Sequence, residues 1–113
     1  MENPIRYNRN QSIELMPRLR GVYFIENIRE GKTYIGSSVD VMARWREHIE
    51  GCNNPNKVHL TNKRLAIDWK KYGSHAFSFR FESYPLLTLD ELQDLETEKI
   101  QTLQPFYNIK DKF

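Results

Sequence analysis

The chain of 113 residues, 39% hydrophobic and 28% charged, has the length and composition of a single soluble globular domain. This composition excludes a disordered tail, and no segment approaches the roughly 20 apolar residues of a membrane span. The first residues lack the apolar segment of a secretory signal. A single cysteine, Cys52, excludes an internal disulfide and a multi-cysteine metal site. We therefore expect a cytoplasmic protein with a free thiol and no membrane partner, in the host cell cytoplasm if a phage encodes it.

The net charge of +2 is unevenly distributed along the chain. Residues 1–80 contain 14 Lys and Arg against 8 Asp and Glu, a charge of +6, whereas residues 81–113 contain 3 against 7, a charge of −4. A basic surface of this kind suits phosphate. A small protein can also reach such an asymmetry by chance, so the charge is weak support for a nucleic-acid partner.

The first part of the chain consists of a polar segment and a hairpin. Residues 1–19 are expected to form an N-terminal extension, in which only Ser12–Met16 has the pattern of a short helical turn, and residues 20–113 to form the domain. Between Gly21 and Gly36, two apolar and β-branched runs flank a polar segment that contains Gly31. This pattern predicts a β-hairpin. Each strand carries one tyrosine, and for the hairpin alone half-buried packing is the simpler interpretation.

A helix follows the hairpin. Ser38 is expected to cap this helix, which should run to about Glu50 and end at Gly51. Its apolar residues recur at i, i+3 and i+7, so Arg44 and His48 project together from one flank of the buried face. The apolar stripe consists of Met42, Trp45 and Ile49.

A loop rich in Asn and Pro, a second helix and a strand come next. The second helix is expected from Leu60 or Thr61 to Tyr72, with Gly73 closing it and Trp69 on its inward side. The alternation of Phe77, Phe79 and Phe81 with polar residues predicts a half-buried strand. For both tryptophans, core packing explains the position better than base stacking. The last segment, residues 106–109, is expected to be a short strand or extended.

A third helix, from about Leu89 to Leu103, contains an unusual carboxylate. Glu96 completes an inner line of leucine and isoleucine, whereas the other acidic residues lie off that line. A carboxylate on an apolar face must be paired, protonated or bound to a cation, because burying it alone is costly. A rim position, or a salt bridge to an arginine such as Arg44, is the simpler alternative. The apolar members of the line are Leu89, Leu92, Ile100 and Leu103, and the acidic residues off it are Asp90, Glu91, Asp94 and Glu98.

These segments together carry six short motifs in a fixed order. The hairpin strands contain Gly21-Val22-Tyr23 and Tyr34-Ile35-Gly36, with ten residues between the triplets. The other four motifs are Arg44-Trp45-Arg46-Glu47-His48, the segment from Asn62 to Gly73, Glu96, and Tyr107-Asn108-Ile109. The set resembles the GIY-YIG nuclease superfamily, most of all the catalytic domains of phage- and intron-encoded homing endonucleases and their free-standing relatives. Each motif alone is weak, but six in order over residues 21–109 are a strong signal.

The resemblance implies an α+β fold, a three-stranded antiparallel sheet flanked by helices. It also implies a metal-dependent DNA endonuclease that hydrolyses phosphodiester bonds, either stand-alone or as the nuclease module of a larger homing-type enzyme. Six residues would line one cleft and carry the reaction: Tyr23, Tyr34, Arg44, His48, Glu96 and Asn108.

The resemblance also implies a role for each of these residues. Glu96 would hold one divalent cation, Mg²⁺ or Mn²⁺, because a hard carboxylate oxygen suits these ions and no Cys/His set suggests zinc. The cation would polarise the scissile phosphate and stabilise the departing 3′ oxygen. Arg44 would stabilise charge on the phosphate oxygens, Tyr34 would orient the water or the phosphate, and Asn108 would hold the geometry of the site.

The sequence does not decide which residue activates the attacking water. The resemblance favours Tyr23 as the general base with His48 in relay. Because a free tyrosine has a pKa near 10, Tyr23 needs such a neighbour, and His48 could also be the base itself.

The DNA contacts are less well defined. Single-stranded and double-stranded DNA both remain open as substrates, as do a monomer and a homodimer. The main alternative function is a non-catalytic nucleic-acid-binding domain that retains the fold, and the next is a structural or protein-interaction domain. The candidate DNA-binding side chains are His59, Lys63, Arg64 and Arg46, although His59 could equally be an exposed loop residue.

Overall fold

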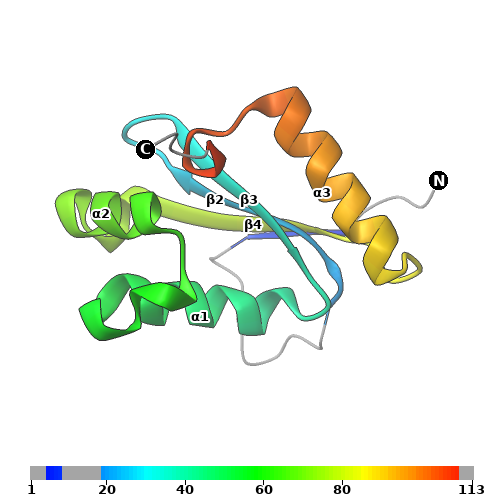
Figure 1. The fold of residues 1–113 in the computed structure, drawn as a ribbon, viewed down its shortest axis with the longest axis horizontal. Coiled ribbons are helices and arrows are strands. Elements are labelled where there is room, and N and C mark those ends of the chain that lie inside the picture. Colours follow the sequence, from blue (N-terminus) through cyan, green and yellow to red (C-terminus); the bar gives the residue numbers. More distant parts are fainter. Residues whose placement is uncertain (1–4, 9–18, 110–113) are drawn as a thin grey trace.

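The computed structural model describes residues 5–8 and 19–109. A four-stranded antiparallel sheet forms its centre, in the order β1-β4-β2-β3 (Figure 1). The strands are β1 (Ile5–Asn8), β2 (Gly21–Asn27), β3 (Lys32–Ser38) and β4 (Phe77–Ser83). The helices are α1 (Val41–Asn53), α2 (Lys63–Tyr72) and α3 (Leu89–Leu103), with three short 3-10 helices, η2 (Pro55–Leu60), η3 (Ser74–Ala76) and η4 (Phe106–Asn108).

The predicted three-stranded sheet is confirmed as β2, β3 and β4, and β1 adds a fourth strand that was not predicted. β1 lies within the N-terminal extension and pairs with β4 from Ile5 opposite Ser83 to Asn8 opposite Arg80. An edge strand is held largely by backbone pairing, so it needs no strong sequence pattern. The helical turn expected at Ser12–Met16 lies outside the described residues.

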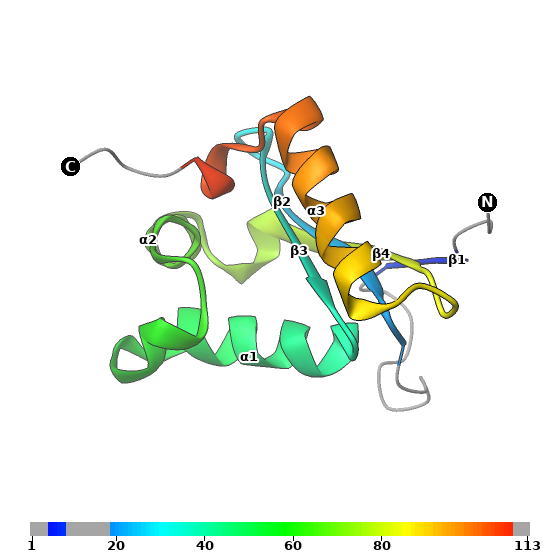
Figure 2. The same ribbon diagram turned by 45° about the vertical axis from the view of Figure 1, so that its right-hand side comes forward.

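The alternation of side chains along β2 divides the core in two. Tyr23 and Ile25 pack with residues of α1 and α2, whereas Val22 and Phe24 pack with residues of α3. Figure 2 shows α1 and α2 on one side of the sheet and α3 on the other. The α1/α2 side holds the aromatic residues of β4 and both tryptophans, of which Trp45 stacks on Phe79 with ring centroids 4.6 Å apart. Core packing of both tryptophans is therefore confirmed.

The hairpin turn follows from local chemistry. Gly31 has a φ of +67°, in the left-handed region that a glycine adopts without strain. The side-chain oxygen of Asn27 accepts hydrogen bonds from the backbone N–H groups of Arg29 (3.1 Å) and Glu30 (3.2 Å). These contacts support the turn and confirm the predicted hairpin.

The first helix differs from the prediction at both ends. Its N-cap is Asp40, whose carboxylate accepts from the N–H of Ala43 at 3.1 Å, while the Ser38 hydroxyl accepts from the N–H of Asp40. The helix also continues through Gly51 to Asn53, and η2 replaces much of the expected loop. A Cβ at Gly51 would lie 2.9 Å from the Thr61 methyl carbon, so the glycine serves close packing against η2 rather than helix termination.

The second helix and the C-terminal segment define the opposite end of the molecule. α2 begins at Lys63, because the side chain of Asn62 caps it by accepting from the N–H of Leu65, and it ends at Gly73 as predicted. The segment expected to be a short strand is instead the 3-10 helix η4. The amide of Asn62 also donates to the carbonyl of Tyr107 at 2.8 Å, which ties α2 to η4.

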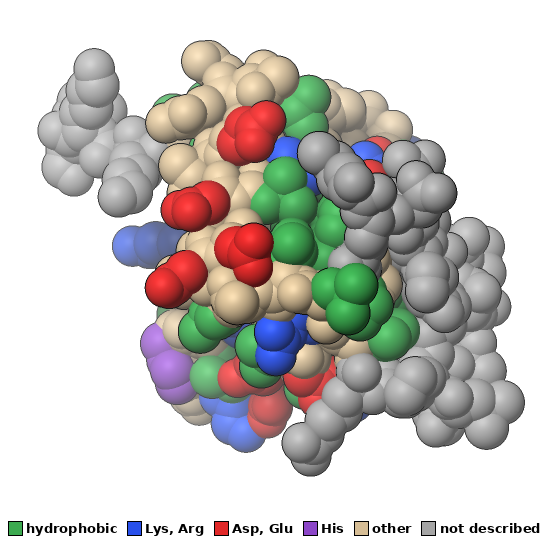
Figure 3. All heavy atoms as spheres, turned by 90° about the vertical axis from the view of Figure 1, so that its right-hand side faces the viewer, with side chains coloured by type: hydrophobic (Ala, Val, Ile, Leu, Met, Phe, Trp, Pro, Cys, Tyr) green, Lys and Arg blue, Asp and Glu red, His purple; other side chains and the backbone are tan. Residues whose placement is uncertain are grey.

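The bounds of the third helix are confirmed, but its inward face differs from the prediction. Leu92 is buried, whereas Leu89 and Leu103 are 49% and 60% exposed. Ile100 packs against the buried residues as predicted, and so does Leu95, which was not predicted to do so. Acidic side chains gather on the upper part of the molecule, where α3 lies (Figure 3). In the part of the chain that the structure describes, no helix has the length and apolar character needed to cross a membrane.

Candidate active site at the edge of the sheet

The candidate site surrounds β3, which forms one edge of the sheet. α1 follows β3 directly and packs on the face that carries Tyr23, α3 packs on the opposite face, and η4 bonds to the free edge. The six residues expected to share a cleft come from five elements around this edge: Tyr23 (β2), Tyr34 (β3), Arg44 and His48 (α1), Glu96 (α3) and Asn108 (η4).

The position of Tyr23 depends on a glycine in the next strand. Tyr23 lies opposite Gly36 in the β2–β3 pairing. A Cβ at residue 36 would lie 2.4 Å from both the Cζ and the hydroxyl oxygen of Tyr23, closer than any real side chain allows. The phenol ring therefore lies directly over Gly36, and the second triplet of the motif provides space for the tyrosine of the first.

Tyr23 and His48 form a buried hydrogen-bonded pair. The Tyr23 hydroxyl lies 2.8 Å from Nε2 of His48, and Nδ1 of His48 lies 2.7 Å from the hydroxyl oxygen of Thr61. Tyr23 is 1% exposed and His48 is 0% exposed. Tyr34 is half-buried beside them, with its ring centroid 6.2 Å from that of Tyr23 and 5.2 Å from that of His48. The solvent side of the cluster is thus Tyr34.

Burial keeps these three side chains neutral. It raises the pKa of Tyr23 well above its usual value, and the neighbouring Tyr34 acts in the same direction. Burial also raises the pKa of Tyr34, although the positive charge of Arg44 partly opposes this. For His48, burial lowers the pKa to about 3, and Arg44 adds to the effect. Near pH 7 the pair can therefore exchange a proton but holds no charge of its own.

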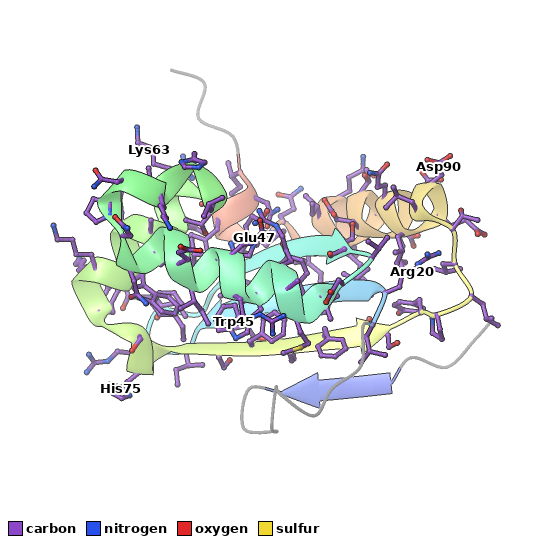
Figure 4. The ribbon with its side chains drawn as sticks, turned by 90° about the horizontal axis from the view of Figure 1, so that it is seen from below. Arg20, Trp45, Glu47, Lys63, His75 and Asp90 are labelled. Carbon is purple, nitrogen blue, oxygen red and sulfur yellow. The ribbon has the colours of Figure 1, made fainter. Side chains whose placement is uncertain are left out.

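Arg44 is held in place by its neighbours on η2 and α1. Its Nη1 donates to the carbonyl of Leu60 at 2.7 Å and lies 3.6 Å from the carboxylate of Glu47. Figure 4 shows Trp45 and Glu47 on opposite sides of α1, so the Arg44–Glu47 pair lies away from the Trp45 core. The positive charge of the guanidinium acts to lower the pKa values of Tyr23, Tyr34 and His48. Arg44 is therefore a fixed positive charge beside the Tyr23–His48 pair.

Glu96 reaches the site from the other face of the sheet. Its Oε1 accepts a hydrogen bond from the Ser37 hydroxyl at 2.5 Å, and its negative charge raises the pKa of both tyrosines. Within the described residues, Glu96 therefore contacts Ser37. The alternative expectation, a salt bridge between Glu96 and Arg44, is not seen among these residues, because Arg44 pairs with Glu47. The serine bond uses Oε1, and for the other carboxylate oxygen no hydrogen bond to a described residue is seen.

Asn108 pairs with the free edge of β3. Its Oδ1 accepts from the N–H of Ile35 at 2.7 Å, and its Nδ2 donates to the carbonyl of Ile35 at 2.9 Å. The amide therefore replaces the neighbouring strand that an edge residue lacks, one residue from Tyr34 and one from Gly36.

The four candidate DNA-binding residues lie in different places. His59 and Lys63 are exposed on η2 and α2, and Arg46 is exposed on α1. Arg64 lies with its guanidinium carbon 5.3 Å from the ring centroid of Phe106, two residues before Asn108. Among these four residues, Arg64 therefore lies beside the site, through its contact with Phe106.

Two residues of the site were not found from the sequence. Thr61, the partner of His48, comes from the segment between η2 and α2, and Ser37, the partner of Glu96, directly follows the second glycine triplet. Serine and threonine occur in every loop, so their type alone gave no signal. The available signal is indirect, because a buried histidine and an inward-facing carboxylate both need hydrogen-bond partners.

Comparisons with known proteins show the family and the fold of the chain. Residues 19–108 match the family model described as GIY-YIG catalytic domain. The similar solved structures include the catalytic domain of the homing endonuclease I-TevI, with 26% sequence identity and a TM-score of 0.68. That similarity covers 81% of this chain and 99% of the other. No curated protein matches the chain.

Proposed function

The chain belongs to the GIY-YIG family of catalytic domains, and on this premise we propose that it is a metal-dependent endonuclease that hydrolyses phosphodiester bonds in DNA. The observation that carries the proposal is the neutral Tyr23–His48 pair, hydrogen-bonded at 2.8 Å beside the fixed charge of Arg44. A domain that only binds nucleic acid needs basic groups at its surface, but it needs no buried pair that can transfer a proton.

The positive charge of Arg44 is suited to the phosphate. A guanidinium stays protonated at all relevant pH values and presents several donors to phosphate oxygens. The Leu60 carbonyl and Glu47 hold this group, so it is oriented before the substrate binds. A preoriented donor stabilises the extra negative charge of the transition state without reorganisation during the reaction.

The hydrogen bonds of His48 support Tyr23 as the group that passes it a proton. Nε2 bonds to Tyr23 and Nδ1 to Thr61, so both ring nitrogens are occupied and a proton reaches the ring through Tyr23 rather than directly from the attacking water. The water oxygen forms its bond to phosphorus as the bond to the 3′ oxygen breaks. The water proton passes to the Tyr23 oxygen, and the Tyr23 proton passes to Nε2 of His48. This concerted transfer avoids a free tyrosinate, which the raised pKa of Tyr23 makes costly.

The substrate itself favours this transfer. Burial, and after it the charge of Arg44, lowers the pKa of His48. An anionic phosphate paired with Arg44 offsets the second of these causes, so the imidazole becomes a better proton acceptor once DNA is bound.

Glu96 would hold the cation. Among the described residues there is no cluster of three or more His, Cys, Asp and Glu side chains, which does not suit zinc. A single carboxylate does suit Mg²⁺ or Mn²⁺, because such ions retain water and take further oxygens from the substrate phosphate. When bound, the ion would supply positive charge at the scissile phosphate and at the departing 3′ oxygen.

The test is cleavage by the purified protein with Mg²⁺ or Mn²⁺. One panel should contain single-stranded, duplex and branched DNA together with RNA, so that the substrate class is determined at once. We expect Glu96→Gln to lower the rate more than about 100-fold, since it removes the metal-binding charge. The matched control is Glu98→Gln, an exposed residue on the same helix, which should cleave as the wild type does.

The outcomes separate the alternatives. Cleavage that survives both Glu96→Gln and chelation of divalent ions would refute the role of the cation. Retention of DNA without cleavage of any substrate would support the non-catalytic binding domain instead. Cleavage of one or both strands of the duplex would show whether a single site acts alone or two copies act together.

A further inference from the structure

The hydrogen-bond partners of His48 restrict the protons that its ring can carry. A neutral imidazole has one N–H donor and one acceptor nitrogen. Here both nitrogens face hydroxyl groups, Tyr23 at 2.8 Å from Nε2 and Thr61 at 2.7 Å from Nδ1. A hydroxyl can donate or accept, so two arrangements satisfy the ring, with the proton on either Nδ1 or Nε2.

The acidity of the two hydroxyls favours one arrangement. A phenol, with a usual pKa near 10, is a stronger hydrogen-bond donor than the aliphatic hydroxyl of threonine. The Tyr23 hydroxyl therefore donates to Nε2, and the Nδ1–H donates to the Thr61 oxygen. The threonine hydroxyl then has a further partner in Cys52, whose Sγ lies 3.8 Å away.

Thr61 is held well enough to impose this choice. Its backbone N–H bonds to the carbonyl of Val58 at 3.1 Å at the end of η2. Its methyl group packs against Gly51, where any Cβ would approach it to 2.9 Å. With the backbone and the methyl group both fixed, the hydroxyl is directed at His48.

We propose that Thr61 is a positioning residue that keeps the proton of neutral His48 on Nδ1, so that Nε2 is the acceptor for the Tyr23 proton. In the transfer, the O–H bond of Tyr23 breaks, a bond from Nε2 to hydrogen forms, and the Nδ1–H continues to donate to Thr61. The positive charge that forms on the ring is therefore met by the threonine oxygen on the far side from Tyr23. This role rests on the proposed nuclease function, but the tautomer does not.

Few other described groups act on the imidazole of His48 or on its two hydrogen-bond partners. The described titratable and charged groups that act on His48 or on its two partners are Tyr34, Arg44, Cys52 and Glu96. Of these, Cys52 is a neutral thiol near pH 7, because burial raises its pKa to about 11. Arg44 and Glu96 affect how readily the ring accepts a second proton, whereas its two hydroxyl partners decide where the first one lies.

The first experiment is the ¹⁵N NMR spectrum of the histidine-labelled full chain near pH 7, because protonated and unprotonated ring nitrogens have distinct chemical shifts. We expect a protonated Nδ1 and an unprotonated Nε2 for His48. The variants His59→Asn and His75→Asn, both at exposed positions, identify the other two signals. A wild-type His48 protonated on Nε2 would overturn the proposal, whether or not the protein cleaves DNA.

The second experiment compares three variants. Thr61→Val keeps the branched shape but has no hydroxyl, and we expect the ring proton to move to Nε2 and kcat to fall by about 10–100-fold with little change in KM. Thr61→Ser restores the hydroxyl and should recover both the tautomer and most of kcat. Thr97→Val, on the exposed side of α3, is the matched control and should change neither.

Each failure has a distinct meaning. If Thr61→Val folds like the wild type in thermal unfolding and keeps its kcat, Thr61 has no positioning role. A serine variant that does not recover kcat would also refute it, since loss of packing would then explain the defect. If the wild type cleaves no substrate, the proposed function fails, and the NMR spectrum still decides the tautomer.

Discussion

The two faces of the sheet differ in how deeply they bury their functional groups. Among the described residues, the core on the α1/α2 face contains twelve buried side chains and includes the tyrosine of the first triplet. The core on the α3 face contains five, and the helix itself buries Leu92 alone. His48 is fully buried against the first core, whereas Glu96 is partly exposed above the second.

This difference matches the chemistry proposed for each face. Proton transfer needs fixed hydrogen bonds and exclusion of competing water, which a dense aromatic core provides. A carboxylate that takes up a hydrated ion needs access to solvent, which a thinly packed helix allows. Substitutions on the first face should therefore affect folding and catalysis together, while those on the second should affect them separately.

The largest expected effect is on the stability of the densely packed face. Trp45→Ala should lower the free energy of unfolding by about 3–5 kcal/mol, because it removes a buried indole stacked on Phe79. Leu92→Ala should cost only about 2–3 kcal/mol, since the partly exposed residues around it can close the space. Urea unfolding of both variants measures the difference. Leu103→Ala, at an exposed position, is the control, and equal losses at positions 45 and 92 would contradict the comparison.

The next effect is the loss of stability in mild acid. The pKa of His48 is about 3 in the folded chain and near 6.5 in the unfolded chain, so between these values the unfolded chain binds one more proton. Stability therefore falls as pH drops below 6.5, by about 1.4 kcal/mol per pH unit, or roughly 2 kcal/mol by pH 5. Urea unfolding at pH 7, 6 and 5 measures this slope, in a range where few carboxylates titrate.

Histidine variants show whether His48 causes this pH dependence of the free energy of unfolding. His48→Gln should remove most of it, although the variant is less stable at neutral pH. His59→Asn, at an exposed position, should keep it. A slope that disappears with His59→Asn instead would show that burial of His48 is not its source.

The smallest expected effect is at the free edge of β3. Asn108→Ala removes two hydrogen bonds to Ile35 that water can partly replace, so it should lower the free energy of unfolding by about 1–2 kcal/mol. Amide hydrogen exchange at Ile35 should become faster while that at Ile25, in the centre of the sheet, stays unchanged. Asn56→Ala, on the exposed surface of η2, is the control. Unchanged exchange at Ile35 would mean that Asn108 does not hold this edge.

The parts of the fold with strong local patterns were predicted correctly. The glycine of the turn and the paired apolar runs indicated the hairpin, and alternating phenylalanines indicated β4. The bounds Leu89–Leu103 followed from the apolar spacing and from Pro105 beyond the helix. The family resemblance, carried by six short motifs, is confirmed by the family model and the solved structure.

The parts that depend on distant contacts were not predictable. Leu89 and Leu103 fit a helical stripe, but they lie at the two ends of α3 and are exposed, whereas Leu92 between them is buried. Asp40 caps α1 because its carboxylate, rather than the Ser38 hydroxyl, reaches the N–H of Ala43. The roles of Thr61 and Ser37 arise from neighbours 13 and 59 residues away along the chain.

The pairing of Asn108 with β3 has a consequence for self-association. Edge strands with free backbone groups can recruit a strand from another copy and start edge-to-edge aggregation. At Ile35 both groups are already bonded to a side-chain amide in the geometry that an incoming strand would use. A second copy of β3 thus meets an occupied position in the middle of the edge. The residue that secures the candidate active site also keeps this edge from acting as a template for aggregation.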